Sequence, residues 1–272
     1  MAKIVLITGA SSGMGRATAR YLAARGYKVY ALSRSVSKLS DIATKHLIPV
    51  EIDLKEYASI EKAVFRIVKE EKRVDILINN AGYGVVSALE YATEEQVREQ
   101  FDINVFALMR MCKAVIPSMR RNNYGVIINI SSFLGKVGLP LLTLYNASKY
   151  AVEGITDSLR YELREFNIRI HSVMPGFFDT EFARTNLVTN EATFQKESAY
   201  ASLTQTLAPT IIEQINNGND ALEVARLILR IIEDENFQAR TTVGDKSKKF
   251  IPMRKELSDE DFERRVREYY GI

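Results

Sequence analysis

The sequence has a single cysteine, no surplus of charge of one sign and no long hydrophobic run. Because Cys112 is the only cysteine among 272 residues, an internal disulfide is excluded and a reducing compartment is expected. The 37 basic and 34 acidic residues leave a net charge of +3, too near balance to favour nucleic acid or an anionic membrane as a partner. No apolar run reaches the ~18 residues of a membrane span. With a strand beginning almost at Met1, a signal peptide is not expected either, and we predict a cytoplasmic protein.

Histidine is also scarce, and the two that are present predict no metal site. His46 is expected to end a helix and His171 to lie within a strand, and neither has a second histidine or cysteine at ligand spacing. Internal repeats, low-complexity tracts and interdomain linkers are absent as well. A chain of this length therefore predicts one domain over residues 1–272.

Apolar strand-like segments alternate with amphipathic helical patterns along most of the chain. This alternation predicts an α/β fold, doubly wound, with a parallel seven-stranded sheet flanked by helices. Strands are expected at residues 3–9, 28–34, 49–53, 74–80, 125–131, 168–174 and 239–244. Helices are expected at residues 14–25, 36–45, 57–71, 94–120, 143–166 and 220–234, with a capping box formed by Thr93 and Gln96.

Two segments depart from this rhythm. Residues 177–219 contain no expected strand, and aromatic residues interrupt their polar background, so we interpret them as a mobile substrate lid inserted in the domain. Residues 245–272 form a C-terminal tail whose basic and acidic residues nearly cancel, which favours a solvated surface. Ser258 with Asp261 predicts the start of a final short helix that ends near Tyr270.

A glycine-rich turn follows the first strand. Residues 3–8 read as a buried strand and lead directly into Gly9-Ala10-Ser11-Ser12-Gly13-Met14-Gly15, after which a helical pattern begins. A strand, a glycine turn and a helix start in that order present backbone N–H groups and the positive end of the helix dipole to an anion. The order therefore predicts a site for the pyrophosphate of a dinucleotide.

Tyr145 and Lys149 stand four residues apart in an expected helix, and Ser132 precedes them at the end of an apolar strand. Residues at this spacing share one helix face, so a phenol and an ammonium project side by side. A cation beside a tyrosine lowers the pKa of the phenol, which otherwise lies near 10. The pattern predicts a proton-handling site, whereas the same pair in isolation is typical of a surface tyrosine and a solvated lysine.

Together these residues resemble the short-chain dehydrogenase/reductase family, and the resemblance runs from about Ile4 to about Gly244. The stretch from Tyr145 to Leu163 looks most like the hydroxysteroid and retinol dehydrogenase branch. The motifs that carry the family resemblance are Thr8-Gly9-x-x-x-Gly13-x-Gly15, Asp53, Asn79-Asn80-Ala81-Gly82, Asn104, Ser132, Tyr145, Lys149, Pro175-Gly176 and Thr180.

The resemblance implies a Rossmann-type oxidoreductase with four catalytic residues. Ser132 would hold the carbonyl oxygen of the substrate, and Tyr145 would exchange a proton with it. Lys149 would hold the nicotinamide ribose and lower the pKa of Tyr145. Asn104 would kink its helix and keep a water in the proton relay, although an asparagine in a helix can also act only as a cap or kink.

The resemblance also implies a nicotinamide cofactor, and the end of the second strand indicates which one. Ser33 stands where the NAD-preferring members carry aspartate, and Arg34 follows. Since a guanidinium holds phosphate bidentately, we predict NADP(H), the alternative being a solvated arginine at a strand end. The expected cofactor-binding residues are Thr8, Gly9, Ser11, Ser12, Gly13, Met14, Gly15, Ser33, Arg34, Asp53, Leu54, Asn80, Ala81, Gly82, Tyr145, Lys149, Pro175, Gly176, Phe178 and Thr180.

The expected substrate wall is apolar and has no cluster of basic residues. We therefore predict a small-molecule carbonyl or secondary alcohol of steroid-like or other lipid character. The alternatives are a 3-oxoacyl thioester reductase and, from another class, a non-catalytic NADP(H)-binding regulatory protein, against which the complete catalytic set argues. The helices at 94–120 and 143–166, which form the two-fold interface in the family, carry excess apolar surface and predict a homodimer or homotetramer. The expected substrate contacts are Ser132, Leu134, Leu139, Tyr145, Phe177 and Phe182.

Overall fold

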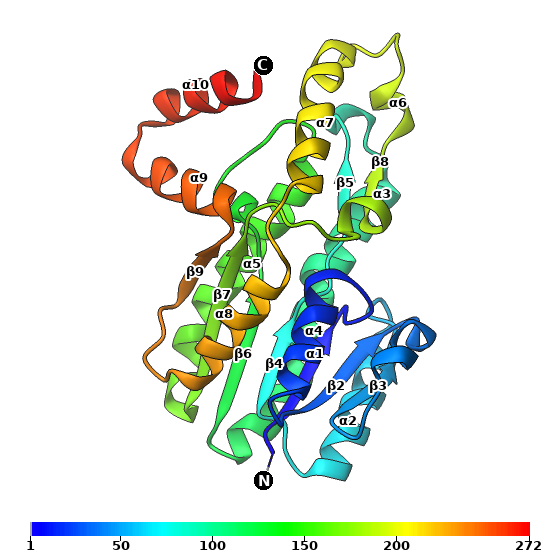
Figure 1. Cartoon of the computed structure of the whole chain (residues 1–272), viewed down its shortest axis with the longest axis vertical. Helices are drawn as coiled ribbons and strands as arrows, with labels where there is room; N and C mark the ends of the chain where they lie inside the picture. Colours follow the sequence, from blue (N-terminus) through cyan, green and yellow to red (C-terminus); the bar gives the residue numbers. More distant parts are fainter. Residues whose placement is uncertain (1) are drawn as a thin grey trace.

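A computed structural model describes residues 2–272, and one seven-stranded parallel sheet forms its centre (Figure 1). The strand order β3-β2-β1-β4-β6-β7-β9 places the topological switch between β1 and β4, where doubly wound sheets bind their ligands. The predicted fold class is confirmed. The strands are β1 (Ile4–Thr8), β2 (Lys28–Ser33), β3 (Leu47–Glu51), β4 (Ile76–Asn79), β6 (Gly125–Ile130), β7 (Ile168–Pro175) and β9 (Arg240–Val243).

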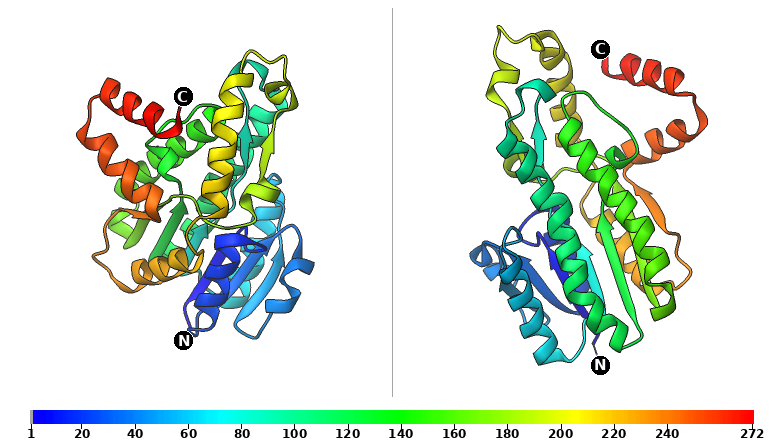
Figure 2. Two further views of the ribbon diagram at one scale, coloured as in Figure 1. Left: turned by 45° about the horizontal axis from the view of Figure 1, so that its top comes forward. Right: turned by 180° about the vertical axis from the view of Figure 1, so that it is seen from behind.

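Helices cover both faces of the sheet (Figures 1 and 2). The central strands β1, β4 and β6 are wholly buried, as expected for a parallel sheet with helices on both sides, whereas the edge strands β3 and β9 are only partly buried. The helices of one face are α2 (Tyr57–Glu71), α4 (Ala107–Arg121) and α5 (Thr143–Glu162). The helices of the other face are α1 (Gly13–Ala23) and α8 (Leu222–Glu233), which pack against each other.

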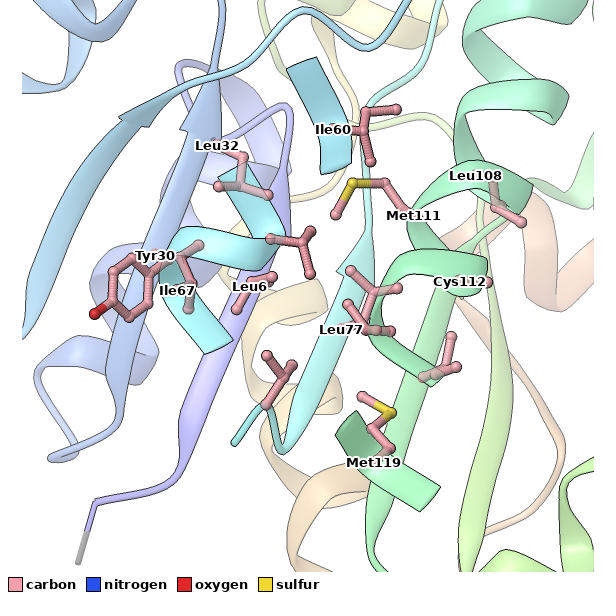
Figure 3. Close-up of a cluster of buried hydrophobic side chains, with 14 of the residues drawn as sticks. Leu6, Tyr30, Leu32, Ile60, Ile67, Leu77, Leu108, Met111, Cys112 and Met119 are labelled. Atoms are coloured by element: carbon pink, nitrogen blue, oxygen red, sulfur yellow. The ribbon is translucent and has the colours of Figure 1, made fainter. Parts of the chain in front are cut away.

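The core beneath α2 and α4 contains Cys112 (Figure 3). Burial raises the pKa of its thiol to about 12, so it is an inert apolar side chain, as predicted. On β7, His171 is buried within the strand, also as predicted, and its Nδ1 lies 3.1 Å from the carbonyl oxygen of Gln238. Burial lowers the pKa of His171 to about 4, so the ring is neutral at physiological pH.

Two expected helices are interrupted or shortened. The helix expected at 94–120 is divided into α3 (Glu94–Phe101) and α4 by a π-helical turn, Asp102–Phe106, while its Thr93–Gln96 capping box is confirmed. The helix expected at 36–45 is wrong, because only a 3₁₀ turn forms there, Val36–Ile42. Its serines bond to nearby backbone, and this competes with α-helix formation. His46 therefore lies in the turn before β3 and ends no helix.

The expectation of no strand between 177 and 219 is also wrong. Residues Leu187–Thr189 form β8, which pairs in parallel with β5 (Gly84–Val86) in a small second sheet. The same segment contains a short helix, α6 (Glu191–Phe194), and a long one, α7 (Ala201–Asn216). The pairing was hidden from sequence reasoning because each strand has only three residues and its partner lies far away in the chain.

The C-terminal tail is two helices rather than a solvated segment with one. The unexpected α9 (Asp245–Glu256) follows β9 directly, and α10 (Asp259–Tyr270) is capped by Ser258, whose hydroxyl accepts from the Asp261 N–H at 3.1 Å, as predicted. Phe250 and Tyr270 point inward and stack at 6.1 Å in a buried cluster that also includes Phe133 and Leu207 of α7. The tail thus packs on α7 beside the substrate region (Figure 1).

Candidate active site

The glycine turn joins β1 to α1 and lies against the end of β4. Gly9 has φ +65°, and a Cβ there would come within 2.8 Å of the Ala81 backbone. At Gly15 a Cβ would meet the Asn80 side chain at 2.3 Å. The amide of Asn80 donates to the carbonyl oxygens of Thr8 and Gly9, at 3.0 and 3.1 Å. Hence the glycines let the turn and the β4 end pack together, which fixes the floor of the cofactor groove.

Helix α1 begins at this turn with an open N-terminus. Ser12, at the N-cap, has no side-chain capping bond, and the first turn has no acidic residue. Backbone N–H groups and the helix dipole therefore face a polar groove of about 350 Å³. This arrangement fits a dinucleotide pyrophosphate. The groove brings together the predicted residues Gly9, Ser11, Ser12, Gly13, Met14, Gly15, Ser33, Arg34, Asp53, Leu54, Asn80, Ala81, Gly82 and Thr180.

Thr8 was also expected to contact the cofactor, but it does not line this groove. Its side chain is buried, and its hydroxyl accepts from the N–H groups of Asn80 and Ala81, at 3.0 and 3.1 Å. Thr8 therefore ties β1 to β4 from below rather than lining the groove.

Two basic residues at the groove escaped sequence reasoning, Lys38 and Lys55. The 3₁₀ turn that carries Lys38 is held by Arg16, which donates to the Lys38 carbonyl oxygen at 2.6 Å and pairs with Asp41. Lys55 forms an ion pair with Glu99. The signal for Lys38 was its place four residues after Arg34, so the groove has a second cation close to the predicted phosphate contact.

Helix α5 carries Tyr145 and Lys149 to the C-terminal end of β6. Lys149 is 4% exposed, and its Nζ donates to the Ile130 carbonyl oxygen at 2.9 Å and lies 5.6 Å from the centre of the Tyr145 ring. Ser132 follows β6 and its hydroxyl accepts from the Leu134 N–H at 3.1 Å. All three line the same cavity. The trio expected from the sequence is therefore brought together.

The protonation states differ from the expectation. Burial raises the pKa of Tyr145 to about 12, and a hydrogen bond with Ser132 only partly opposes the rise. Burial lowers the pKa of Lys149 to about 8, with the Glu153 carboxylate opposing it. The predicted lowering of the Tyr145 pKa by Lys149 is thus wrong for this structure, because desolvation dominates. At neutral pH Tyr145 holds its proton and Lys149 is largely charged.

Asn104 sits in the π-helical turn and is 2% exposed. Its side chain accepts from the Tyr83 N–H at 2.8 Å and donates to the Tyr83 carbonyl oxygen and the Ser148 hydroxyl, both at 2.9 Å. A small cavity of about 10 Å³ lies between Asn104, Ile130 and Lys149, close to the volume one water needs. The irregularity expected at Asn104 takes the form of this π-helical turn, and the side chain also links α5 to the segment after β4. The role of Asn104 in holding a water stays a prediction.

A second cavity of about 230 Å³ adjoins the groove, and its wall is mostly apolar. Of the expected residues it includes Ser132, Leu134, Tyr145, Lys149, Pro175, Gly176, Phe177, Phe178 and Phe182. The prediction that Leu139 contacts the substrate is wrong, because Leu139 packs in a buried cluster and does not line the cavity. The helix α7 supplies much of the opposite wall, through Leu207, Ala208, Ile211, Ile212 and Ile215.

The α7 contribution was missed although the sequence contained its signal. Leu207, Ile211 and Ile215 repeat at intervals of four, the period of one helix face. Phe182 was expected and lies where the groove and the cavity meet, since it lines both. Its ring centre is 6.2 Å from that of Tyr145. The site therefore consists of a polar groove and an apolar cavity that meet at Phe182, with Tyr145 on the cavity side.

A family model for short chain dehydrogenases matches residues 3–191, more than half of the chain and all four predicted catalytic residues. The chain belongs to the short-chain dehydrogenase family. The predicted family resemblance is thereby confirmed, and with it an oxidoreductase that acts on carbonyl and hydroxyl groups.

Relatives in this family cover nearly the whole chain. A 3-ketodihydrosphingosine reductase of Bacteroides thetaiotaomicron is 40% identical over 257 residues, 92% of this chain and 93% of that protein. A probable short-chain type dehydrogenase/reductase of Helicobacter pylori, VdlC, is 32% identical over 252 residues, 92% of this chain and 91% of its own. The dehydrogenase/reductase SDR family member 7B of Mus musculus is 32% identical over 233 residues, 82% of this chain and 68% of its own.

Solved short-chain dehydrogenase structures share the architecture. One from Streptomyces avermitilis has a TM-score of 0.85 and 29% identity, and the match covers 100% of this chain and 96% of that one. Another, from Burkholderia cenocepacia in complex with NADP, has a TM-score of 0.75 and 27% identity over 96% and 94% of the two chains.

Among residues 2–272, no helix is both long and apolar enough to cross a membrane. The same residues contain no group of three or more histidine, cysteine, aspartate or glutamate side chains arranged to hold a metal ion.

Proposed function

We propose that this protein is an NADPH-dependent reductase that converts a ketone on a long-chain or otherwise apolar lipid into a secondary alcohol. The observation that carries the proposal is a polar groove that fits a dinucleotide and adjoins an apolar cavity lined by a protonated Tyr145. A phenol that keeps its proton at neutral pH is suited to donate it to a forming alkoxide. This favours the direction of reduction.

The residues of the site have separate tasks in this reaction. The bound cofactor supplies a hydride to the substrate carbonyl carbon. The Ser132 hydroxyl hydrogen-bonds the carbonyl oxygen, and Tyr145 donates its proton to that oxygen as negative charge develops. The charged Lys149 would stabilise the resulting phenolate and would hold the ribose of the cofactor. The water-sized cavity beside Asn104 would offer a path for replacing the proton.

The cofactor assignment rests on charge at the end of β2. Arg34 and Lys38 both line the groove, and Ser33 brings no carboxylate that would repel a 2′-phosphate. The NADP found with the Burkholderia cenocepacia relative supports the same cofactor here.

The substrate class rests on the cavity wall. Lys149 is its one ionisable cation among the lining residues, and aliphatic and aromatic side chains make up most of the rest. Burying methylene groups there is worth about 0.8 kcal/mol each, so a hydrocarbon chain gains affinity with length. The lipid ketone named for the Bacteroides thetaiotaomicron relative supports a long-chain ketone rather than a steroid.

The test is a substrate panel with purified protein and NADPH, read by loss of NADPH fluorescence. It contains 3-ketodihydrosphingosine, ketosteroids, retinal, acetoacetyl thioesters and small aldehydes. We expect the highest kcat/KM with the long-chain ketone. Fastest turnover of an acetoacetyl thioester would instead identify a 3-oxoacyl thioester reductase. NADPH binding without consumption of any carbonyl would identify a non-catalytic regulatory protein.

We also infer a homo-oligomer, in which α4 and α5 meet their copies in a partner subunit. Four large side chains on these helices and the π-helical turn before α4 are 40–83% exposed and would be covered by a partner subunit: Phe106, Met109, Tyr150 and Tyr161. Sedimentation should show a dimer or tetramer at micromolar concentration, and a lone species of 30.8 kDa would contradict this.

The lid and the location remain proposals as well. We infer that residues 177–219 act as a lid on a single domain, with its base fixed by the β5–β8 pairing and α7 as the part that adapts to substrate. The location that we propose is cytoplasmic.

A further inference from the structure

Helix α5 carries an acidic residue one turn beyond Lys149. Tyr145, Lys149, Glu153 and Asp157 recur every four residues, so they follow one another along a single helix face. Glu153 is 1% exposed, whereas the side chain of Asp157 is 50% exposed. A buried carboxylate is costly unless it is paired and hydrogen-bonded. The partners of Glu153 therefore explain how it is retained there.

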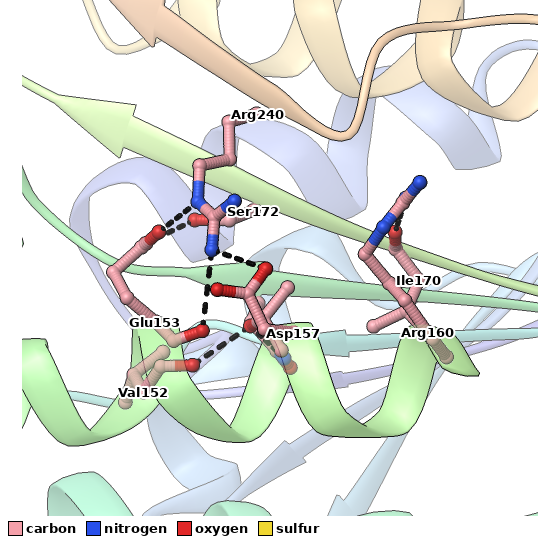
Figure 4. A network of polar contacts seen from close by, with 9 residues as sticks. Val152, Glu153, Asp157, Arg160, Ile170, Ser172 and Arg240 are labelled. Carbon is pink, nitrogen blue, oxygen red and sulfur yellow. Dashed lines mark hydrogen bonds and ion pairs between the residues drawn. The ribbon is translucent and has the colours of Figure 1, made fainter. Parts of the chain in front are cut away.

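Two neighbouring strands provide those partners (Figure 4). Ser172 of β7 donates its hydroxyl hydrogen bond to one carboxylate oxygen of Glu153. Arg240 of β9 donates from Nε to the other oxygen at 2.5 Å and from a terminal nitrogen to Asp157 at 2.6 Å. Ser172 and Arg240 are register partners in the sheet, so a single strand pair holds the carboxylate from both sides.

The position of Glu153 is constrained by packing as well as by charge. A Cβ at Gly135 would lie 3.2 Å from Glu153 Cγ and 3.0 Å from the Lys149 carbonyl oxygen. The turn at Gly135 thus presses on the helix between the two side chains. Glu153 cannot turn toward solvent without moving this turn or α5, and its carboxylate stays on the inner side of the helix, next to the base of the catalytic site.

We propose that Glu153 is a positioning residue, a buried carboxylate fixed by Ser172 and Arg240 that keeps the ammonium of Lys149 charged and in place. This role for Glu153 rests on the proposed function in one respect, the part that Lys149 takes in catalysis. Lys149 is buried, and its ammonium donates a hydrogen bond to the neutral carbonyl oxygen of Ile130. Glu153 supplies the negative charge that opposes desolvation of that ammonium.

The charged and titratable groups that face this pair come from several elements. Tyr145 and Asp157 lie on α5 itself, and Arg240 approaches from β9. Ser172 of β7 and the Ile130 carbonyl oxygen at the end of β6 add neutral dipoles, and Asn104 lies across the small cavity from Lys149. Arg240 therefore weakens the field of Glu153 at Lys149, which makes the effects of the two residues opposite in sign.

The experiment measures the pKa of Lys149 in the unliganded protein, by NMR of isotope-labelled lysine side chains assigned with Lys149→Arg. Glu153→Gln keeps the shape and removes the charge, so the pKa of Lys149 should fall from about 8 by about one unit. Arg240→Gln should raise the pKa of Lys149, because the negative charge of Glu153 is then no longer offset by a guanidinium and acts more strongly on Lys149. The matched control is Asp157→Asn, which removes the exposed carboxylate that pairs with Arg240. This variant should change the pKa of Lys149 little.

A purely structural role would not produce shifts of opposite sign. An unchanged Lys149 pKa in Glu153→Gln, or shifts in the same direction in both variants, would overturn the proposal. If Glu153→Gln does not fold, Arg240→Gln tests the proposal by itself. An unchanged or lowered Lys149 pKa in Arg240→Gln would then contradict the proposal. NADPH affinity measured against pH by fluorescence is the second readout. A pKa shift without a matching shift in the affinity profile would leave the role of Glu153 intact and refute the cofactor role of Lys149.

Discussion

Polar groups and backbone line the cofactor groove, whereas apolar side chains line the cavity that adjoins it. The groove is formed by a turn and strand ends of the central sheet, whose positions are set by close backbone contacts such as Gly9 against Ala81. One wall of the cavity is formed by α7. This helix follows the small β5–β8 sheet in the chain and packs on α10. We infer from this difference that one half recognises a fixed anion geometry, whereas the other adapts its shape to hydrocarbon.

The largest expected effect concerns Tyr145, the proton donor in the cavity wall. Tyr145→Phe removes the phenolic proton and little else, so kcat should fall about 10²–10⁴-fold while NADPH affinity changes little. Stopped-flow reduction of a long-chain ketone and fluorescence titration of NADPH measure the two quantities. Tyr161→Phe, on the exposed side of α5, is the control and should behave as wild type. A Tyr145→Phe variant with a third of the wild-type rate would refute the assignment.

The next effect tests the apolar half alone. Ala208→Phe places a ring in the cavity from α7 and should exclude roughly three methylene groups, which lowers kcat/KM for a long-chain ketone by roughly 50-fold. A short-chain ketone should be little affected. Gln205→Phe, on the exposed side of α7, is the control. Equal losses with long and short ketones would show that the chain does not lie against α7.

The third effect tests the polar half alone. Arg34→Ala removes a charge-assisted contact worth roughly 1.5–3 kcal/mol, so kcat/KM with NADPH should fall about tenfold to a hundredfold while NADH kinetics stay nearly unchanged. Ser33→Asp should go further, because its carboxylate repels a 2′-phosphate. Arg25→Ala, beyond the C-terminal end of α1 and outside the groove, controls for loss of surface charge. Wild-type preference for NADH would make Arg34 a solvated strand-end residue.

The smallest effect concerns the base of the lid. Thr193 is fully buried, and its hydroxyl accepts from the Ala88 N–H at 3.1 Å, while Asn190 accepts from the Thr193 N–H at 3.1 Å. Thr193→Val leaves the Ala88 N–H unpaired and should cost about 1–3 kcal/mol of unfolding free energy, measured by urea denaturation. Thr206→Val, on exposed α7 surface, should cost less than about 0.5 kcal/mol. Equal costs would mean that the lid base is not fastened.

The two halves also differ in how far the sequence predicts them. The groove follows from contiguous signals, because a buried strand, a glycine turn and a helix start are neighbours in the chain. The wall formed by α7 does not, since its apolar period predicts a helix but not the cavity that the helix faces. Leu139 illustrates the limit: an apolar residue near Ser132 belongs equally to a core or to a pocket until its neighbours are known.

The alternation of strands and helices, the glycine turn that fits an anion and the place of Tyr145 and Lys149 on one helix face all follow from the amino-acid order, because local spacing controls all three. The protonation states depend on the folded arrangement, since burial by distant segments raises the pKa of Tyr145 and lowers that of Lys149. The folded arrangement also brings Glu153 to Arg240, 87 residues apart in the sequence, and pairs β5 with β8. Desolvation and long-range pairing depend on which segments meet in space, and residue spacing along one chain does not encode that directly.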